Sequence, residues 1–186
     1  TTHAVGNANG FSTNSGGGFV SVGDAYATAS VNVGSTITVA ADATITASQN
    51  LTIDSYAETD GQSKASTSAG GLGSGVDSRA TVNLDYLSKV DIRGALTAGG
   101  ALAVEAHTVV DGYVYAYANA SGLGADADAN DSGENRGIRI GNTRASTQVV
   151  IGSTAELVGD TVSIIAQVDR MKGLAEATAK ASALGA

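Results

Sequence analysis

The sequence contains no cysteine, no proline and no tryptophan in 186 residues, and aromatic residues make up only 4% of it. Without cysteine the chain can form no disulfide, no zinc–thiolate site and no cysteine nucleophile. It also has no apolar run of about eighteen residues, so we expect no transmembrane helix. Apolar residues still amount to 42%, and they are mostly Ala and Val with some Ile and Leu. Such small side chains fit a thin core, in which each layer closes directly onto the next.

Basic residues are also scarce, with 10 Lys and Arg against 18 Asp and Glu and a net charge of −8. Nucleic-acid binding depends on Lys and Arg that displace counterions, and anionic membrane surfaces attract basic segments. The sequence therefore predicts no nucleic-acid partner and no membrane insertion. An acidic composition rich in Ser, Thr, Asn and Gly is typical of many exported bacterial proteins, which favours an extracellular or cell-surface location.

Two sequence phrases recur with the same spacing. Alternating small residues lead to Leu72-Gly73, Leu123-Gly124 and Leu184-Gly185, so the leucines lie 51 and then 61 residues apart. Aliphatic residues six positions apart form the second phrase, and its first two copies match at an offset of 51. These copies are Val33, Val39, Ile45 and Leu51, and Leu84, Val90, Leu96 and Leu102. Two phrases that share one offset identify an internal repeat.

The third copy of the repeat is ten residues longer between its Leu-Gly phrases. We expect the extra length within residues 130–144, a polar stretch that contains Gly and Asn. In a repeat protein an insertion of this kind forms a loop on one face.

Within the repeat, apolar residues alternate with polar ones. Apolar or small residues occupy odd positions from Ala25 to Ala57 and even positions from Ala80 to Ala120. A period of two is typical of β-strands and excludes a helix. The alternation is interpreted as running through the Gly-rich turns without losing phase, which favours a coil that keeps turning the same way over hairpins.

The predicted fold is therefore all-β, a parallel β-helix (β-solenoid) built from imperfect repeats of about 51–61 residues, in preference to an antiparallel sandwich. Right-handed winding is preferred, because a left-handed hexapeptide helix would need small residues where Ile37 and Gln49 stand. Since about 51 residues exceed one typical coil, we expect two or more coils per repeat.

The ends of the sequence carry no capping features. The chain opens without Met or a signal peptide and stops within the repeated phrase at Leu184-Gly185-Ala186. We interpret residues 1–186 as a single β-solenoid segment of a longer repetitive chain, one that continues or stacks end to end with copies of itself.

The repeats contain Leu-x-Ala-Gly-Gly-x-Leu-x-Val at Leu96–Val104 and Gly-Ser-x-Ala-x-Leu at Gly152–Leu157, together with Ala-x-Ala and Gly-Leu-Gly phrases. This pattern resembles the β-strand repeats of bacterial surface proteins of the filamentous-adhesin and autotransporter-passenger type. The resemblance covers nearly the whole chain. It implies a non-catalytic structural or adhesive segment of a surface filament, with no catalytic residues to carry over.

An acidic run provides the candidate metal site, at Asp126, Asp128, Asn130 and Asp131. Oxygen ligands on alternate residues can converge on a hard cation such as Ca²⁺, which is the one cofactor that the sequence suggests. The alternative is that the intervening alanines face inward and the carboxylates are simply solvated.

The tyrosines Tyr113, Tyr115 and Tyr117 form a predicted outward row that could stack on sugar rings of a glycan or contact a host or neighbouring surface. An exposed strand edge without a partner is the alternative. Of the two histidines, His107 lies at an outward position, so we expect it to face solvent and take no part in catalysis.

A second function stays open at this point, that of a polysaccharide-binding or polysaccharide-lyase β-helix. It would need an acidic Ca²⁺ cluster opposite basic side chains on adjacent coils. The sequence offers Asp126 and Asp128 with Arg136, Arg139 and Arg144.

Overall fold

The computed structural model describes residues 1–130 and 136–183. These residues form eleven strands and no helix, and hence nothing helical in this range could cross a membrane. The strands are β1 (Thr2–Gly17), β2 (Val20–Val39), β3 (Thr44–Ala47), β4 (Leu51–Gly70), β5 (Gly73–Ile92), β6 (Ala95–Ala98), β7 (Ala101–Gly122), β8 (Gly124–Ala129), β9 (Gly137–Ile151), β10 (Glu156–Val158) and β11 (Thr161–Ala183).

The strands form three parallel sheets that the chain visits in turn. Sheet A has the order β1-β4-β7-β11, sheet B the order β2-β5-β8 with β9 also on β5, and sheet C the order β3-β6-β10. Every pairing is parallel, and each circuit of the chain adds one strand to each sheet, except that the third circuit adds both β8 and β9 to sheet B. This arrangement confirms the predicted all-β solenoid, while its right-handed winding stays a prediction.

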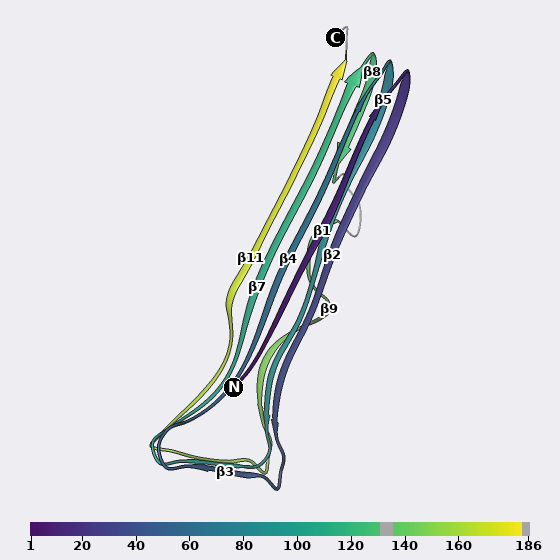
Figure 1. Ribbon diagram of the computed structural model, residues 1–186. Helices are drawn as coiled ribbons and strands as arrows, with labels where there is room; N and C mark the ends of the chain where they lie inside the picture. Colours follow the sequence, from purple (N-terminus) through teal and green to yellow (C-terminus); the bar gives the residue numbers. More distant parts are fainter. Residues whose placement is uncertain (131–135, 184–186) are drawn as a thin grey trace.

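One repeat makes one coil, so the expectation of two or more coils per repeat was wrong. Leu51 of β4 lies directly opposite Leu102 of β7, which places successive repeats on neighbouring coils. The reason is strand length, because β2, β4 and β5 each have 20 residues and extend to about 65 Å. Figure 1 shows sheets A and B running together from a sharp tip and separating at the other end, where short sheet C closes a triangle.

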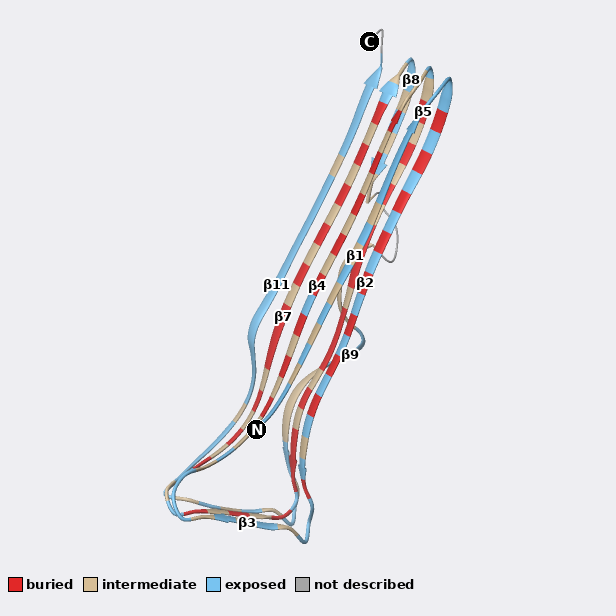
Figure 2. Ribbon diagram, in the orientation of Figure 1, coloured by how far each residue is buried: buried red, intermediate tan, exposed pale blue. Residues whose placement is uncertain are grey.

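The core is thin where sheets A and B run together and wider beside sheet C. Along β2 buried and exposed side chains alternate, and along β5 and β7 buried and half-buried ones do (Figure 2), which confirms most of the predicted inward positions. Ala41, in the corner after β2, is exposed instead. Near the tip the buried apolar residues are mostly alanines, such as Ala69, Ala118 and Ala120. Larger residues fill the triangular end, where Ile92, Leu96, Leu102 and Val104 belong to one buried cluster.

Buried hydroxyl groups link the two long sheets in a way that the apolar pattern did not predict. Ser55 Oγ lies 2.8 Å from Ser35 Oγ and 3.1 Å from Ser88 Oγ, and Ser88 Oγ also donates to the Ser55 carbonyl oxygen at 2.7 Å. Thr2 Oγ1 extends the series to β1 at 2.7 Å from Ser35 Oγ. Because each hydroxyl can both donate and accept, these small polar residues satisfy one another inside the core.

The register between the first two coils differs from the predicted one by two residues. Val31 lies opposite Leu84 and Val33 opposite Tyr86, an offset of 53 rather than 51 along the long strands. The offset returns to 51 in sheet C, where Ile45 lies opposite Leu96, because the preceding corner is longer in the first coil. Since side chains alternate with a period of two, a two-residue error leaves every inward residue inward.

The inward phase changes at the tips, which corrects the expectation of unbroken alternation. Ala69 before the tip and Ser74 after it are both buried, so the inward positions pass from odd to even across Gly71-Leu72. The phase is kept at the two corners beside sheet C, as between Val39 of β2 and Ser55 of β4. Across the tip, the buried positions on either side are an odd number of residues apart, so the inward positions change from odd to even. Across the corners beside sheet C they are an even number apart, so the inward positions stay odd or stay even.

The additional residues of the third coil enter at more than one place. The offset between β5 and the third coil is 51 at Ser78 and Ala129 and 56 at Thr81 and Gly137. It then rises to 59 at Tyr86 and Ala145, across an irregularity in β9. Residues 131–135 of the predicted 130–144 insertion lie outside the described residues.

Asp85 fixes the irregular part of β9 on the outer face of sheet B. Its carboxylate accepts hydrogen bonds from Thr143 N at 2.9 Å, Thr143 Oγ1 at 2.6 Å and Arg144 N at 3.2 Å. Burial by itself raises the pKa of Asp85, but these hydrogen bonds and the Arg144 charge outweigh it and hold the pKa below its ordinary value.

The Asp85→Asn variant is expected to lower the free energy of unfolding at pH 7 by about 2 kcal/mol, because hydrogen bonds to a charged acceptor are lost. Since the folded-state pKa lies below the unfolded one, the carboxylate stabilises the fold above about pH 4. This contribution disappears as the pH falls through the folded-state pKa. Urea unfolding at several pH values should show the variant and the native chain converging in acid. Asp126→Asn, at an exposed position, is the control and should change the free energy of unfolding at pH 7 little.

Candidate functional site

The predicted tyrosine row lies on the outer face of sheet A. Tyr113, Tyr115 and Tyr117 alternate with the fully buried Val114 and Ala116 on β7. The rings of Tyr115 and Tyr117 stack with centroids 6.4 Å apart and an interplanar angle of 7°. The three side chains are half-buried rather than fully exposed, because β4 and β11 flank them on both sides.

Cationic side chains from the neighbouring strands cover this row. Lys64 Nζ of β4 lies 5.5 Å from the Tyr113 ring centroid, and Lys180 Nζ of β11 lies 5.7 Å from that of Tyr117. Tyr113 donates a hydrogen bond to Glu176 Oε2 at 3.1 Å. Burial and this carboxylate together raise the pKa of Tyr113. The result is an aromatic surface, bordered by charge, that spans three strands.

The acidic run divides between two different environments. Asp126 and Asp128 lie on β8 and are exposed, while the alanines between them face inward. Asn130 Oδ1 accepts a hydrogen bond from Ala80 N at 2.9 Å, so this candidate ligand atom already bonds to the backbone of β5. Asp131 lies outside the described residues. The described part of the run is thus not drawn together around one point.

Of the basic residues of the lyase alternative, Arg144 is engaged away from these carboxylates. Arg144 donates from Nη2 to Asn32 Oδ1 at 2.9 Å and to the Val33 carbonyl at 3.3 Å, and so binds the first coil. Asp128 lies in register with Asp77, whose carboxylate forms an ion pair with Arg79.

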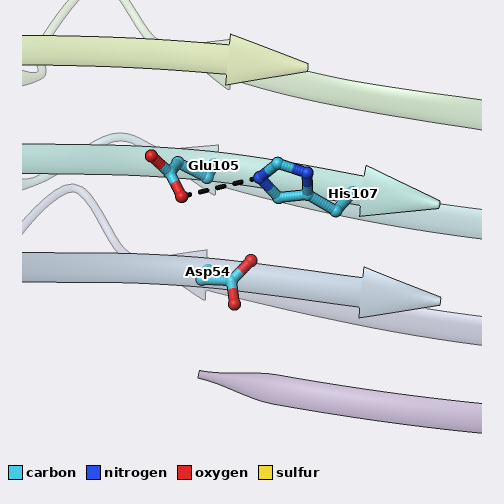
Figure 3. A group of neighbouring side chains, drawn as sticks. All are labelled: Asp54, Glu105 and His107. Carbon is cyan, nitrogen blue, oxygen red and sulfur yellow. Dashed lines mark ion pairs between the residues drawn. The ribbon is translucent and has the colours of Figure 1, made fainter. Parts of the chain in front are cut away.

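A different group of side chains converges on the outer face of sheet A near its triangular end. Asp54 of β4 lies directly opposite Glu105 of β7, and His107 follows two residues later on β7. Figure 3 shows the three side chains turned toward one another from two adjacent strands. One ligand atom from each lies within 4.8 Å of the other two, and Glu105 Oε2 is 3.5 Å from His107 Nε2.

A third strand contributes a carboxylate through a β-bulge. The register of β11 against β7 shifts between Val168 and Arg170, and the extra residue is Asp169. Both carboxylate oxygens of Asp169 lie 3.1 Å from His107 Nδ1, and Gln167 Nε2 donates to one of them at 2.9 Å. Bulges commonly redirect a side chain in this manner.

The electrostatics of this cluster are dominated by negative charge. Partial burial disfavours the charged form of His107, but the hydrogen bond and charge of Asp169, with Glu105 and Asp54, outweigh it and raise the pKa of His107. The adjacent Arg170 is engaged elsewhere, because it forms a two-point ion pair with Asp111. Oδ1 of Asp54 is shielded from solvent and has no hydrogen-bond partner among the described residues.

Sequence reasoning missed this cluster, although one signal was available. His107 was expected on the outer face, and with the offset of 51 between Leu51 and Leu102 Asp54 falls opposite Glu105. Asp169 could not have been found in this way, because the bulge interrupts the register of β11.

The fold and these surfaces define a parallel β-solenoid with a polar and aromatic outer face on sheet A. Comparisons with protein-family models, with curated proteins and with solved structures find no match to this chain.

Proposed function

We propose that this chain is a non-catalytic structural segment of a secreted or cell-surface filament, of the filamentous-adhesin or autotransporter-passenger type. The observation that carries the proposal is the stack itself, in which coil follows coil in parallel register. Each coil uses its neighbours to satisfy its backbone, so the architecture can be extended by adding coils.

The two ends of the described stack support extension. In sheet A, β1 and β11 are edge strands of 16 and 23 residues, long enough to pair with a further coil. Long open edges are templates for strand pairing. Apolar side chains of β11, including Val162 and Ile164, are 44% and 49% exposed, and another coil would cover them. We propose head-to-tail stacking of copies of the chain along this axis.

The tyrosine row provides the adhesive surface in this proposal. Tyr115 and Tyr117 present parallel rings on an otherwise aromatic-poor protein, and flat rings of this kind suit stacking on sugar rings. The lysines beside the row add positive charge that would favour an acidic glycan.

Imaging and light scattering test the filament. Negative-stain microscopy of the purified chain should show elongated particles whose length grows with concentration. The Val5→Lys variant places a charge on the edge strand β1, where Val5 is 62% exposed, and should suppress this growth.

The matched control is Leu72→Lys, at the exposed tip of the middle coil, and it should leave growth unchanged. Globular monomers at every concentration would contradict the proposed filament. Adhesion is measured separately, as retention on immobilised acidic glycans that Tyr117→Ala should reduce.

A further inference from the structure

The cluster of Asp54, Glu105, His107 and Asp169 contains more negative charge than its own side chains neutralise. Asp54 and Glu105 lie directly opposite each other, an arrangement in which like charges destabilise paired strands. Among the described residues, the one basic side chain paired with Glu105 or Asp169 is His107, and none pairs with Asp54. Oδ1 of Asp54 is shielded from solvent and has no hydrogen-bond partner among the described residues, so it has the capacity to accept a ligand.

The spacing of the ligand atoms fits a small metal ion. In a tetrahedral zinc site with bonds of about 2.1 Å, two ligand atoms lie roughly 3.4 Å apart. Glu105 Oε2 and His107 Nε2 are 3.5 Å apart, and one ligand atom from each of Asp54, Glu105 and His107 lies within 4.8 Å of the other two. A rotation of the Asp54 side chain would complete a three-residue site, and a water molecule would then supply the fourth ligand of a tetrahedral ion.

Asp169 orients the histidine as metal sites require. Metal-binding histidines usually donate their second ring N–H to a carboxylate, which fixes the tautomer. Here Nδ1 faces both oxygens of Asp169 at 3.1 Å. When Nδ1 carries the proton and donates it to Asp169, the lone pair of Nε2 is available to a metal ion on the side of Glu105. The β-bulge that introduces Asp169 places it in this position.

We propose that Asp54, Glu105 and His107 bind a divalent transition-metal ion, zinc foremost, and that Asp169 positions His107 for it. An imidazole beside two carboxylates suits zinc and its neighbours, whereas calcium takes oxygen ligands alone. The ion would connect β4 to β7 and, through Asp169, β11, so it would cross-link three successive coils. This inference does not depend on the proposed filament role.

Metal titration tests the site directly. The chain is stripped with a chelator and titrated with zinc chloride in a calorimeter, with the melting temperature followed in parallel. We expect one zinc ion per chain and a higher melting temperature with zinc, but no such rise with calcium. Asp169→Asn should weaken zinc binding by about 10- to 100-fold, as is usual for the partner of a metal-bound histidine.

Three variants complete the experiment. His107→Gln should abolish saturable binding, while His3→Gln, at the second histidine of the same sheet face, and Asp126→Asn, in the acidic run, should bind zinc as the native chain does. Circular dichroism in chelator establishes that each variant is folded. The proposal is wrong if the native chain shows no saturable zinc binding, or if folded His107→Gln retains the native affinity.

Discussion

Replacement of Gly122 by alanine is expected to lower the free energy of unfolding by about 3 kcal/mol, because the tip has no space for a side chain and the backbone there is strained for any other residue. A Cβ atom at Gly122 would lie 1.9 Å from the carbonyl oxygen of Gly71 on the preceding coil. Gly122 also has φ of +151°, which L residues rarely adopt. The obstacle is backbone, so a side-chain rotation cannot relieve it.

Gly124→Ala is the matched control, because a Cβ atom at Gly124 meets nothing within 4 Å. Urea unfolding of both variants beside the native chain measures the difference. Equal stability of the Gly122 and Gly124 variants would show that the tips of adjacent coils do not pack as closely as described. The glycine that precedes Leu123 would then have no steric role at the tip.

Gly61→Leu is expected to have a comparable effect, about 3 kcal/mol or more, through overpacking between sheets A and B. A Cβ atom at Gly61 would lie 2.7 Å from both Leu84 Cδ2 and Val82 Cγ1, and both of these side chains are fully buried. Gly112 and Gly173 lie beside Gly61 on successive strands, so a row of glycines faces the aliphatic residues of the opposite sheet.

Two further variants separate crowding from a general effect of substitution. Gly75→Leu introduces the same side chain on β5 where a Cβ atom meets nothing within 4 Å, and it should unfold close to the native chain. The double variant Gly61→Leu/Leu84→Gly exchanges the large and small residues and should recover part of the loss. If the double variant loses more free energy of unfolding than the two single variants lose together, direct packing between these positions is contradicted.

The architecture could be predicted from the sequence because the period of two and the internal repeat are still recognised when the repeats are misaligned by a few residues. The two-residue error in matching Val33 to Leu84 did not alter which residues face inward. The number of coils per repeat could not be predicted from the same evidence. The alternation of apolar and polar residues indicates which face a residue occupies but not where a strand ends. It therefore did not indicate that strands such as β4 are unusually long.

The prediction of sites was limited by a different cause. Tyr113, Tyr115 and Tyr117 are neighbours along one strand, so the sequence alone could place them on one face. The cluster at His107 instead combines three coils, and its last member depends on a bulge at Asp169. Buried hydroxyls such as Ser55 were missed because hydropathy treats serine as an outward residue, whereas in this core Ser55 forms hydrogen bonds with both Ser35 and Ser88.

The length of the long strands has a consequence for the dimensions of any assembly that this fold builds. Each coil advances the stack by about 4.8 Å, the spacing of neighbouring strands, and consumes about 51 residues in doing so. A stack about 100 Å tall would therefore need on the order of a thousand residues. Its flanks would be about 65 Å broad, so most of that mass forms lateral area. A polymer of this shape is broad and flat. It presents a large lateral surface but gains little length for each residue added.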